Sequence, residues 1–290
     1  MPCKNMIVVV IDRLHAGMLG AYGNSWIQSG QFDHLACQSI LFDQAYLENP
    51  GLDAIYRDYW LGTHTAAPGA AMASLPQLLG AAGWHTALVT DEPELLNFGP
   101  AATFVEQLFV ETPDTHVAAA DVAETQLARL FMAATEWLSA PPEPFCLWIH
   151  ARAMGGPWDA PAELRGQYAD DDDPEPPDFV DVPDCLLADD CDPDELLGIM
   201  HAYAGQVSLL DLCLGALADH LDETGLATNS LWSLLGARGY PLGEHRRVGR
   251  CDEVLYNETV QIPWLLRFPD GLGCMARSQS LVVPCDLPGT

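Results

Sequence analysis

Short apolar runs alternate with amphipathic segments along most of the chain. The run at residues 6–12, MIVVVID, is rich in β-branched residues, which is typical of a strand buried on both faces of a parallel sheet. Runs of the same kind predict further strands at residues 85–90, 145–150, 231–236 and 263–269. Segments between them predict helices at residues 74–83, 121–139 and 193–223. Strands that alternate with helices predict an α/β fold, a three-layer αβα sandwich with a mostly parallel central sheet.

Polar residues stand where several of the predicted strands end. Asp12 closes the first strand, Asp91 follows the second and His150 closes the third, while a long loop at residues 236–250 follows the fourth. Ligands of open α/β sheets bind at the carboxyl ends of the strands. We therefore expect a pocket at this edge, and Asp12 is a candidate site residue before any family is considered.

The length of the chain indicates its number of domains, and its net charge indicates which partners are excluded. A chain of 290 residues with 49% apolar side chains can bury a substantial core, and we expect a single domain over residues 1–290. The excess of 41 acidic over 12 basic residues gives a net charge of −29. Nucleic acids and anionic membranes are bound by clustered Lys and Arg, so neither is an expected partner.

The acids are densest in a proline-rich segment near residues 169–195. Self-repulsion and proline predict an extended, solvated insertion there, and the spacing matches no EF-hand calcium loop. Nine cysteines without a CxxC pair predict reduced thiols. The N-terminus lacks a signal-peptide pattern, and no window approaches the ~20 apolar residues that span a bilayer. A cytoplasmic location is the expectation.

The segment at residues 7–50, IVVVIDRLHAGMLGAYGNSWIQSGQFDHLACQSILFDQAYLENP, resembles the opening of the type I sulfatase family within the alkaline-phosphatase superfamily. The resemblance continues through SLPQLLGAAGWHTALVTDEP, FCLWIHARAMGGPWDAP and LYNETVQIPWLLRFPDG, so it covers nearly the whole chain. It implies an alkaline-phosphatase-like fold and a sulfated or phosphorylated small molecule or glycan as ligand. Family members usually continue into a C-terminal subdomain, and we expect this chain to lack it.

Active members of that family carry Cys or Ser in a C/S-x-P-x-R motif after the NP step, and a divalent metal held by an aspartate pair and a later Asp-Asn or Asp-His pair. Here the nucleophile position matches Leu52, and Leu cannot attack an ester. The aspartate pair becomes Asp12 and Arg13, and the later pair becomes Ala237 and Arg238. Asp12 is the sole retained metal ligand, which is too few for calcium or magnesium, so we expect no metal cofactor. The resemblance, with these departures, implies a catalytically inactive pseudoenzyme.

Arginines are concentrated near the former active site. Seven of the twelve basic residues fall in segments that the fold would gather there: Arg13, Arg57, Arg152, Arg238, Arg246, Arg247 and Arg250. A guanidinium group suits sulfate, phosphate or carboxylate, so we hypothesise an anion pocket without a metal, formed by Arg13, Arg238, His245 and Arg250. In the alternative, Arg13 and Arg238 fill the vacated cavity and neutralise Asp12, because a buried unpaired carboxylate is costly.

Two other functions remain open from the sequence. One is a working sulfuric or phosphoric ester hydrolase whose altered chemistry uses Asp12, Asp53 and His245. The other is a non-catalytic protein-interaction module, with a protein partner or a homo-oligomer. The lack of Cys, Ser or Thr at the attacking position favours the anion-binding protein over the hydrolase.

Overall fold

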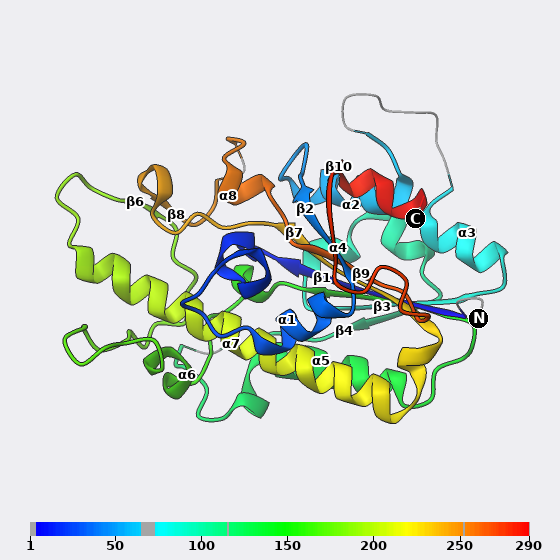
Figure 1. Cartoon of the computed structure of the whole chain (residues 1–290), viewed down its shortest axis with the longest axis horizontal. Coiled ribbons are helices and arrows are strands. Elements are labelled where there is room, and N and C mark those ends of the chain that lie inside the picture. Colours follow the sequence, from blue (N-terminus) through cyan, green and yellow to red (C-terminus); the bar gives the residue numbers. More distant parts are fainter. Residues whose placement is uncertain (1–3, 65–72, 115, 252, 290) are drawn as a thin grey trace.

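A sheet of eight strands runs through the middle of the protein (Figure 1). The computed structural model describes residues 4–64, 73–114, 116–251 and 253–289. In spatial order the strands are β10 (Ala276–Val282), β2 (Ile40–Ala45), β9 (Trp264–Arg267), β7 (Ser230–Arg238), β1 (Asn5–Asp12), β5 (Phe145–Ala151), β3 (His85–Thr90) and β4 (Glu106–Phe109). Only β9 runs antiparallel to its neighbours β2 and β7, which confirms the mostly parallel sheet.

Strand β1 lies at the centre of the sheet because both of its faces are apolar. Ile7, Val9 and Ile11 pack into a core on one face. Val8 and Val10 pack into a second core on the other face. All five side chains are fully buried, so this strand holds Asp12, its last residue, at a fixed position at the carboxyl edge of the sheet.

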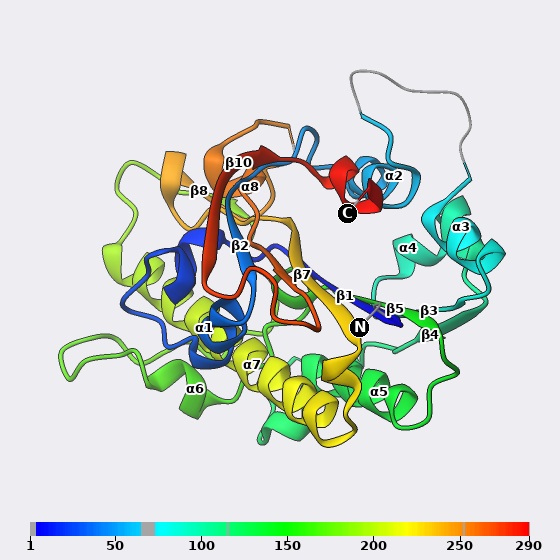
Figure 2. The ribbon, with the colours of Figure 1, turned by 45° about the vertical axis from the view of Figure 1, so that its right-hand side comes forward.

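Helices cover both faces of the sheet and complete the expected three layers (Figure 2). The core that contains Ile7 is closed by helices α1 (Gly30–Cys37), α5 (Gln126–Leu138) and α7 (Pro193–Glu223). The core that contains Val8 is closed by α2 (Leu52–Leu61), α3 (Leu75–Ala81), α4 (Pro93–Leu96) and α8 (Asn257–Val260). The short helix α6 (Ala162–Gly166) packs on α7.

Helix α7 has the length and apolar composition of a membrane span, and it is the one such helix within the described ranges. However, 67% of its most apolar stretch is buried inside the protein. Its residues Ala202, Val207 and Leu214 belong to the core beneath the sheet. This is the burial expected of the central helix of an α/β domain.

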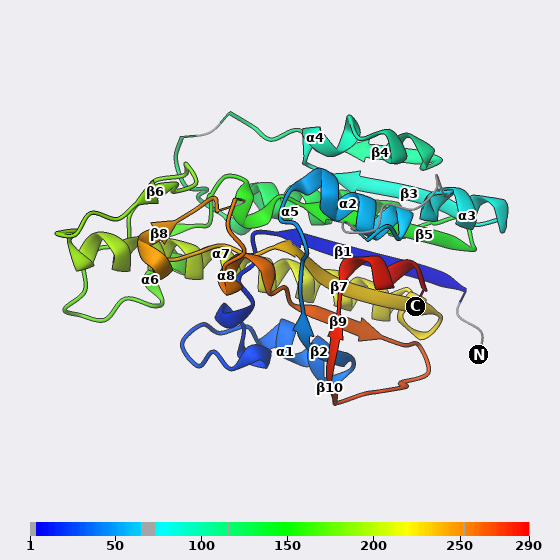
Figure 3. The ribbon, with the colours of Figure 1, turned by 90° about the horizontal axis from the view of Figure 1, so that it is seen from above.

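The acidic segment is largely irregular and exposed, as its composition predicts, and it is also anchored to the domain at several points. Its strand β6 (Cys185–Leu186) pairs with β8 (Arg247–Val248) at the end of the molecule opposite the N-terminus (Figure 3). Arg165 is 1% exposed, and its guanidinium donates to the carbonyl oxygens of Pro177 and Phe179 at 2.6 and 2.9 Å. These backbone contacts hold the segment against the loops that follow β5 and β7.

Close backbone packing at Gly239, directly after β7, provides a test of the fold. A Cβ at this position would lie 2.0 Å from the carbonyl oxygen of Glu258. Because the backbone must shift, Gly239→Ala is expected to lower the free energy of unfolding by about 2 kcal/mol in urea denaturation. The control Gly80→Ala, in open space on α3, is expected to be neutral or slightly stabilising. Equal losses in both variants would contradict this packing.

A buried carboxyl group on α2 makes stability depend on pH. Asp58 is 3% exposed, and burial together with the charge of Glu48 raises its pKa from 3.8 to about 7. The folded state therefore holds the proton more tightly than the unfolded state, and the associated stability is lost as the pH rises from about 4 to 7. We expect Asp58→Asn to exceed the wild type by about 1–2 kcal/mol at pH 8 and to match it at pH 4. Urea denaturation at both pH values measures this, and a pH-independent difference would contradict it.

Candidate functional site

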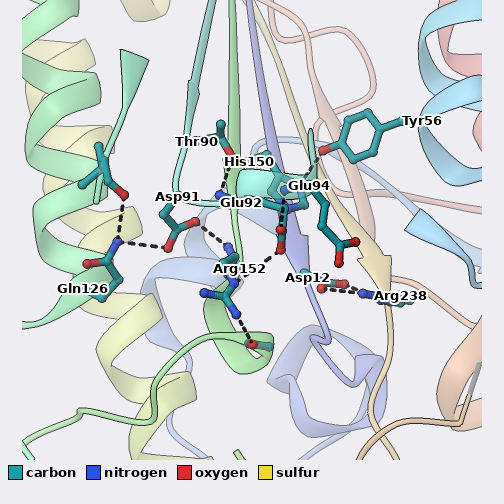
Figure 4. Close-up of polar contacts among 12 residues, drawn as sticks. Asp12, Tyr56, Thr90, Asp91, Glu92, Glu94, Gln126, His150, Arg152 and Arg238 are labelled. Atoms are coloured by element: carbon teal, nitrogen blue, oxygen red, sulfur yellow. Dashed lines mark hydrogen bonds and ion pairs between the residues drawn. The ribbon is translucent and has the colours of Figure 1, made fainter. Parts of the chain in front are cut away.

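Asp12 and Arg238 form a buried ion pair at the carboxyl ends of β1 and β7 (Figure 4). The two residues face each other in the parallel register, just after a bulge between Ile11 and Asp12. Arg238 Nε lies 2.9 Å from Asp12 Oδ1, and Nη2 lies 3.2 Å from Oδ2, so the contact is bidentate. Arg238 Nη1 also donates to the carbonyl oxygen of Pro50 at 3.1 Å. One guanidinium thus joins both strand ends to the segment that precedes α2.

The charge of Asp12 is compensated within the site. Asp12 is 2% exposed, and burial alone would raise the pKa of its carboxyl group. The guanidinium groups of Arg238 and Arg13 outweigh that effect and lower the pKa below its ordinary value. Asp12 is therefore a carboxylate at neutral pH, with both oxygens committed to Arg238.

The segment that matches the family's nucleophile motif begins helix α2. Leu52 is its first residue and is 9% exposed. Asp53 and Arg57 form an exposed ion pair along the helix, with 2.9 Å between Arg57 Nε and Asp53 Oδ2. The hydroxyl group of Tyr56 is fully buried and hydrogen-bonded to Nδ1 of His150. Burial raises the pKa of Tyr56 well above its ordinary value, so this hydroxyl is not an activated nucleophile.

The ends of β3 and β5 are joined by a second polar network (Figure 4). Arg152 Nε lies 3.3 Å from the carboxylate of Glu92, and the backbone N–H of Arg152 donates to Asp91 at 2.8 Å. Gln126 donates to the other oxygen of Asp91 at 3.3 Å. Burial raises the pKa of Asp91 to about 6 and lowers that of His150 to about 4. His150 is therefore a neutral imidazole at pH 7.

A cavity of about 380 Å³ opens beside this network, and we call it the arginine cavity. Three arginines from three segments line it, and two further stretches complete the lining: Arg13, Arg152, Arg250, Gly155–Pro157 and Val180–Asp184. Arg13 is 3% exposed, whereas Arg250 is exposed. Gly155 matches the position of the family's histidine, and a Cβ there would lie 3.0 Å from Asp12 Oδ2 and 3.4 Å from Arg13 Cδ. The glycine therefore leaves room for the Arg13 side chain.

Only some of the arginines predicted near the site line this cavity. Arg13 and Arg250 do so, and Arg152 joins them, although it was not among the expected anion ligands. Arg238 is engaged by Asp12, as in the alternative in which it neutralises that carboxylate. The remaining three arginines pair with carboxylates: Arg57 with Asp53, Arg246 with Asp189, and Arg247 with Asp184, which itself lines the cavity.

His245 lies outside the arginine cavity. Its ring stacks on Tyr256 with 3.8 Å between the ring centroids, and its Nε2 is 3.6 Å from the carboxylate of Glu258. Packing against these two residues accounts for its position. Nothing in the spacing of GEH in the sequence could have separated this position from one in the pocket.

A larger cavity of about 490 Å³ lies between α2 and α4 and differs in chemistry. Its walls include Leu52, Leu61 and Phe98, and its one arginine, Arg57, lies over the Phe98 ring and pairs with Asp53. The arginine cavity is therefore the better oxyanion site of the two.

The residues at Asp12 do not fit a divalent metal ion. A calcium or magnesium ion requires several oxygen ligands, and both Asp12 oxygens accept hydrogen bonds from a guanidinium. Arg13 and Arg238, which the family resemblance aligns with metal-ligand positions, both carry positive charge. Over the described ranges, no group of three or more His, Cys, Asp or Glu side chains is arranged to hold a metal.

Comparisons with known proteins agree with the fold. A family model described as Sulfatase matches residues 4–289. A comparison with curated protein sequences gives no match. A phosphonate monoester hydrolase of Agrobacterium radiobacter superposes with a TM-score of 0.82 at 16% identity, over 98% of this chain and 72% of that chain.

Two further solved structures are similar. One is a protein in complex with its substrate D-glucosamine-2-N,6-O-disulfate, with a TM-score of 0.73 and 16% identity over 99% of this chain and 75% of that chain. The other is the C-terminal periplasmic domain of EcEptC from Escherichia coli, with a TM-score of 0.74 and 14% identity over 99% of this chain and 81% of that chain. At these identities the likeness establishes the alkaline-phosphatase-like fold alone.

Proposed function

The chain belongs to the sulfatase family, and we propose that it is a non-hydrolytic member that binds a small oxyanion in the arginine cavity. The loss of hydrolysis is supported by the bidentate contact between Arg238 and Asp12, and the oxyanion site by the three arginines that line the cavity. In this contact a side-chain cation lies beside Asp12, where the family resemblance would place a divalent metal in an active member. The cation that neutralises Asp12 is therefore an arginine side chain in place of a metal ion.

The site lacks a side chain that could act as the nucleophile in ester hydrolysis. Leu52 supports no covalent step, and the nearby Tyr56 hydroxyl is buried with a raised pKa. A hydrolase built on Asp12, Asp53 and His245 is disfavoured because each of the three has a different partner. Asp12 binds Arg238, Asp53 binds Arg57, and His245 stacks on Tyr256.

The arginine cavity suits an anion with several oxygens. Guanidinium groups bind sulfate, phosphate and carboxylate through paired N–H donors, and three of them reach this cavity from separate segments. Arg250 is exposed at its rim, where an incoming anion meets it first. One structural neighbour was solved with a sulfated sugar, which makes a sulfate ester the first ligand to test.

Titration calorimetry with sodium sulfate and sodium phosphate tests this function. We expect saturable binding, and an Arg250→Ala variant should bind about tenfold more weakly because one charge-assisted contact is lost. Arg246→Ala is the matched control, since Arg246 pairs with Asp189 outside the cavity.

The same samples are assayed with p-nitrophenyl sulfate and p-nitrophenyl phosphate, with and without calcium or magnesium. Turnover at the rate of a buffer blank is expected in every case. Absence of anion binding at millimolar concentration, or turnover that exceeds the blank, would contradict the proposal.

A further inference from the structure

The acidic segment forms one wall of the arginine cavity. Residues 180–184, which we call the acidic wall, line the side facing the arginines. The backbone N–H of Trp158 donates to the carbonyl oxygen of Val180 at 2.8 Å, and the Tyr240 hydroxyl donates to that of Pro183. A Cβ at Gly249 would lie 2.5 Å from the same Pro183 oxygen. The wall is thus held at both ends, at a fixed place opposite the guanidinium groups.

The two carboxylates of the acidic wall have different surroundings. Asp184 pairs with Arg247, and its Oδ1 accepts a hydrogen bond from the backbone N–H of Arg250 at 3.1 Å. Asp181 is exposed and lines the cavity, and no ion pair joins it to another residue in the part of the chain that the structure describes. Asp184 therefore supports the loop that carries Arg250, whereas Asp181 is available to a ligand.

Because three arginines and the Asp181 carboxylate line the same cavity, we propose that the arginine cavity selects a small zwitterion. In such a ligand a short linker joins an oxyanion to an ammonium group. This inference rests on the proposed function, which concerns only the oxyanion, and adds a positively charged group to the same ligand. The oxyanion contacts Arg13, Arg152 and Arg250, and the ammonium group contacts Asp181. A volume of about 380 Å³ is small for a ligand pocket, which favours a compact molecule over an oligosaccharide.

Electrostatics gives the acidic wall a selective effect. A simple anion that enters the cavity is attracted by the arginines but repelled by Asp181. An ammonium group on the ligand turns this repulsion into attraction. The Asp181 carboxylate therefore weakens the binding of simple anions and strengthens the binding of zwitterions. With a net charge of −29, the protein repels polyanions at long range and does not oppose the approach of a neutral zwitterion.

Calorimetry with a matched pair of ligands, 2-aminoethyl sulfate and ethyl sulfate, tests the inference. The wild type is expected to bind 2-aminoethyl sulfate about fivefold more tightly, as is typical of a partly exposed ion pair. In an Asp181→Asn variant the preference should disappear, because affinity for 2-aminoethyl sulfate falls while affinity for ethyl sulfate rises. An Asp190→Asn control removes a charge from the same segment outside the cavity and should keep the preference.

The outcomes separate this inference from the proposed function. If ethyl sulfate binds in the arginine cavity but the amine gives no advantage, the zwitterion is wrong and oxyanion binding stands. If neither ligand binds to the wild type, both proposals fail. A preference that survives Asp181→Asn unchanged also overturns the inference, because the ammonium group then meets another partner. Equal affinity for 2-hydroxyethyl sulfate and 2-aminoethyl sulfate would show that hydrogen bonding, and not charge, sets the selectivity.

Discussion

An Arg238→Met substitution is expected to lower the free energy of unfolding by about 3–5 kcal/mol, because it leaves a buried carboxylate without its principal partner. Asp12 is 2% exposed, and its two oxygens accept from Arg238 at 2.9 and 3.2 Å. The carbonyl oxygen of Pro50 loses a donor at the same time. Urea denaturation at pH 7, followed by circular dichroism, measures the loss.

A second substitution identifies the cause of that loss. Adding Asp12→Asn to Arg238→Met removes the uncompensated charge and is expected to restore about 2 kcal/mol. Arg246→Ala breaks an exposed ion pair and should cost less than about 1 kcal/mol. If Arg238→Met behaves like Arg246→Ala, the buried ion pair is not the stabilising contact that its geometry indicates.

The second large effect is expected at Arg165. Its buried guanidinium donates to four carbonyl oxygens, those of Trp158, Ala160, Pro177 and Phe179. An Arg165→Met variant leaves these acceptors without their donor and should lose about 3 kcal/mol of stability. Because two of the acceptors belong to the acidic segment, the acidic wall is also released. We expect faster chymotrypsin cleavage after Phe179, which lies in the released segment, and weaker sulfate binding.

Arg129→Met is the matched control for Arg165→Met. Arg129 is exposed on α5, and its Nε donates to a single carbonyl oxygen, that of Glu124, at 3.2 Å. Its removal should change stability by less than about 0.5 kcal/mol and leave chymotrypsin cleavage after Phe179 unchanged. Similar protection from the protease in both variants would mean that contacts other than those of Arg165 hold the acidic segment.

The central strands could be predicted from the sequence because they are buried on both faces. Strands β1, β3, β5, β7 and β9 all lie within or near the expected runs. The periodicity did not predict β2, β4 or β10. In β2 the apolar run is interrupted by Asp43 and Gln44, whereas β4 and β10 lie at the two edges of the sheet. Only four residues form β4, and most of β10 is exposed, so neither contains an apolar run long enough to separate it from a loop.

The contacts of the site could be predicted only in part. Asp12 follows from its place at the end of a buried strand, and the charge change at Arg13 and Arg238 follows from the family motif. Which of the two arginines pairs with Asp12 does not follow from the sequence. The pairing with Arg238 depends on a bulge that shifts the strand register by one residue. Sequence spacing does not reveal such a bulge, so it could not decide between Arg13 and Arg238 as the partner of Asp12.

The contacts of the acidic segment could not be predicted from the sequence for a different reason. Its composition predicts solvation, and several of its carboxylates are exposed as expected. One of the contacts that fix it to the domain comes from Arg165, a buried cation that donates to backbone carbonyl groups. Backbone acceptors are present in every segment, so no residue pattern marks those that a distant arginine will bind.

The most direct test of the account is the affinity of the protein for sulfate in a chelator and in excess calcium or magnesium, measured by titration calorimetry. If the Arg238 guanidinium stands where active relatives hold a metal, the dissociation constant will be the same under all three conditions. Sulfate binding that is lost in the chelator and restored by either ion would contradict the account, because the anion would then depend on a metal at Asp12.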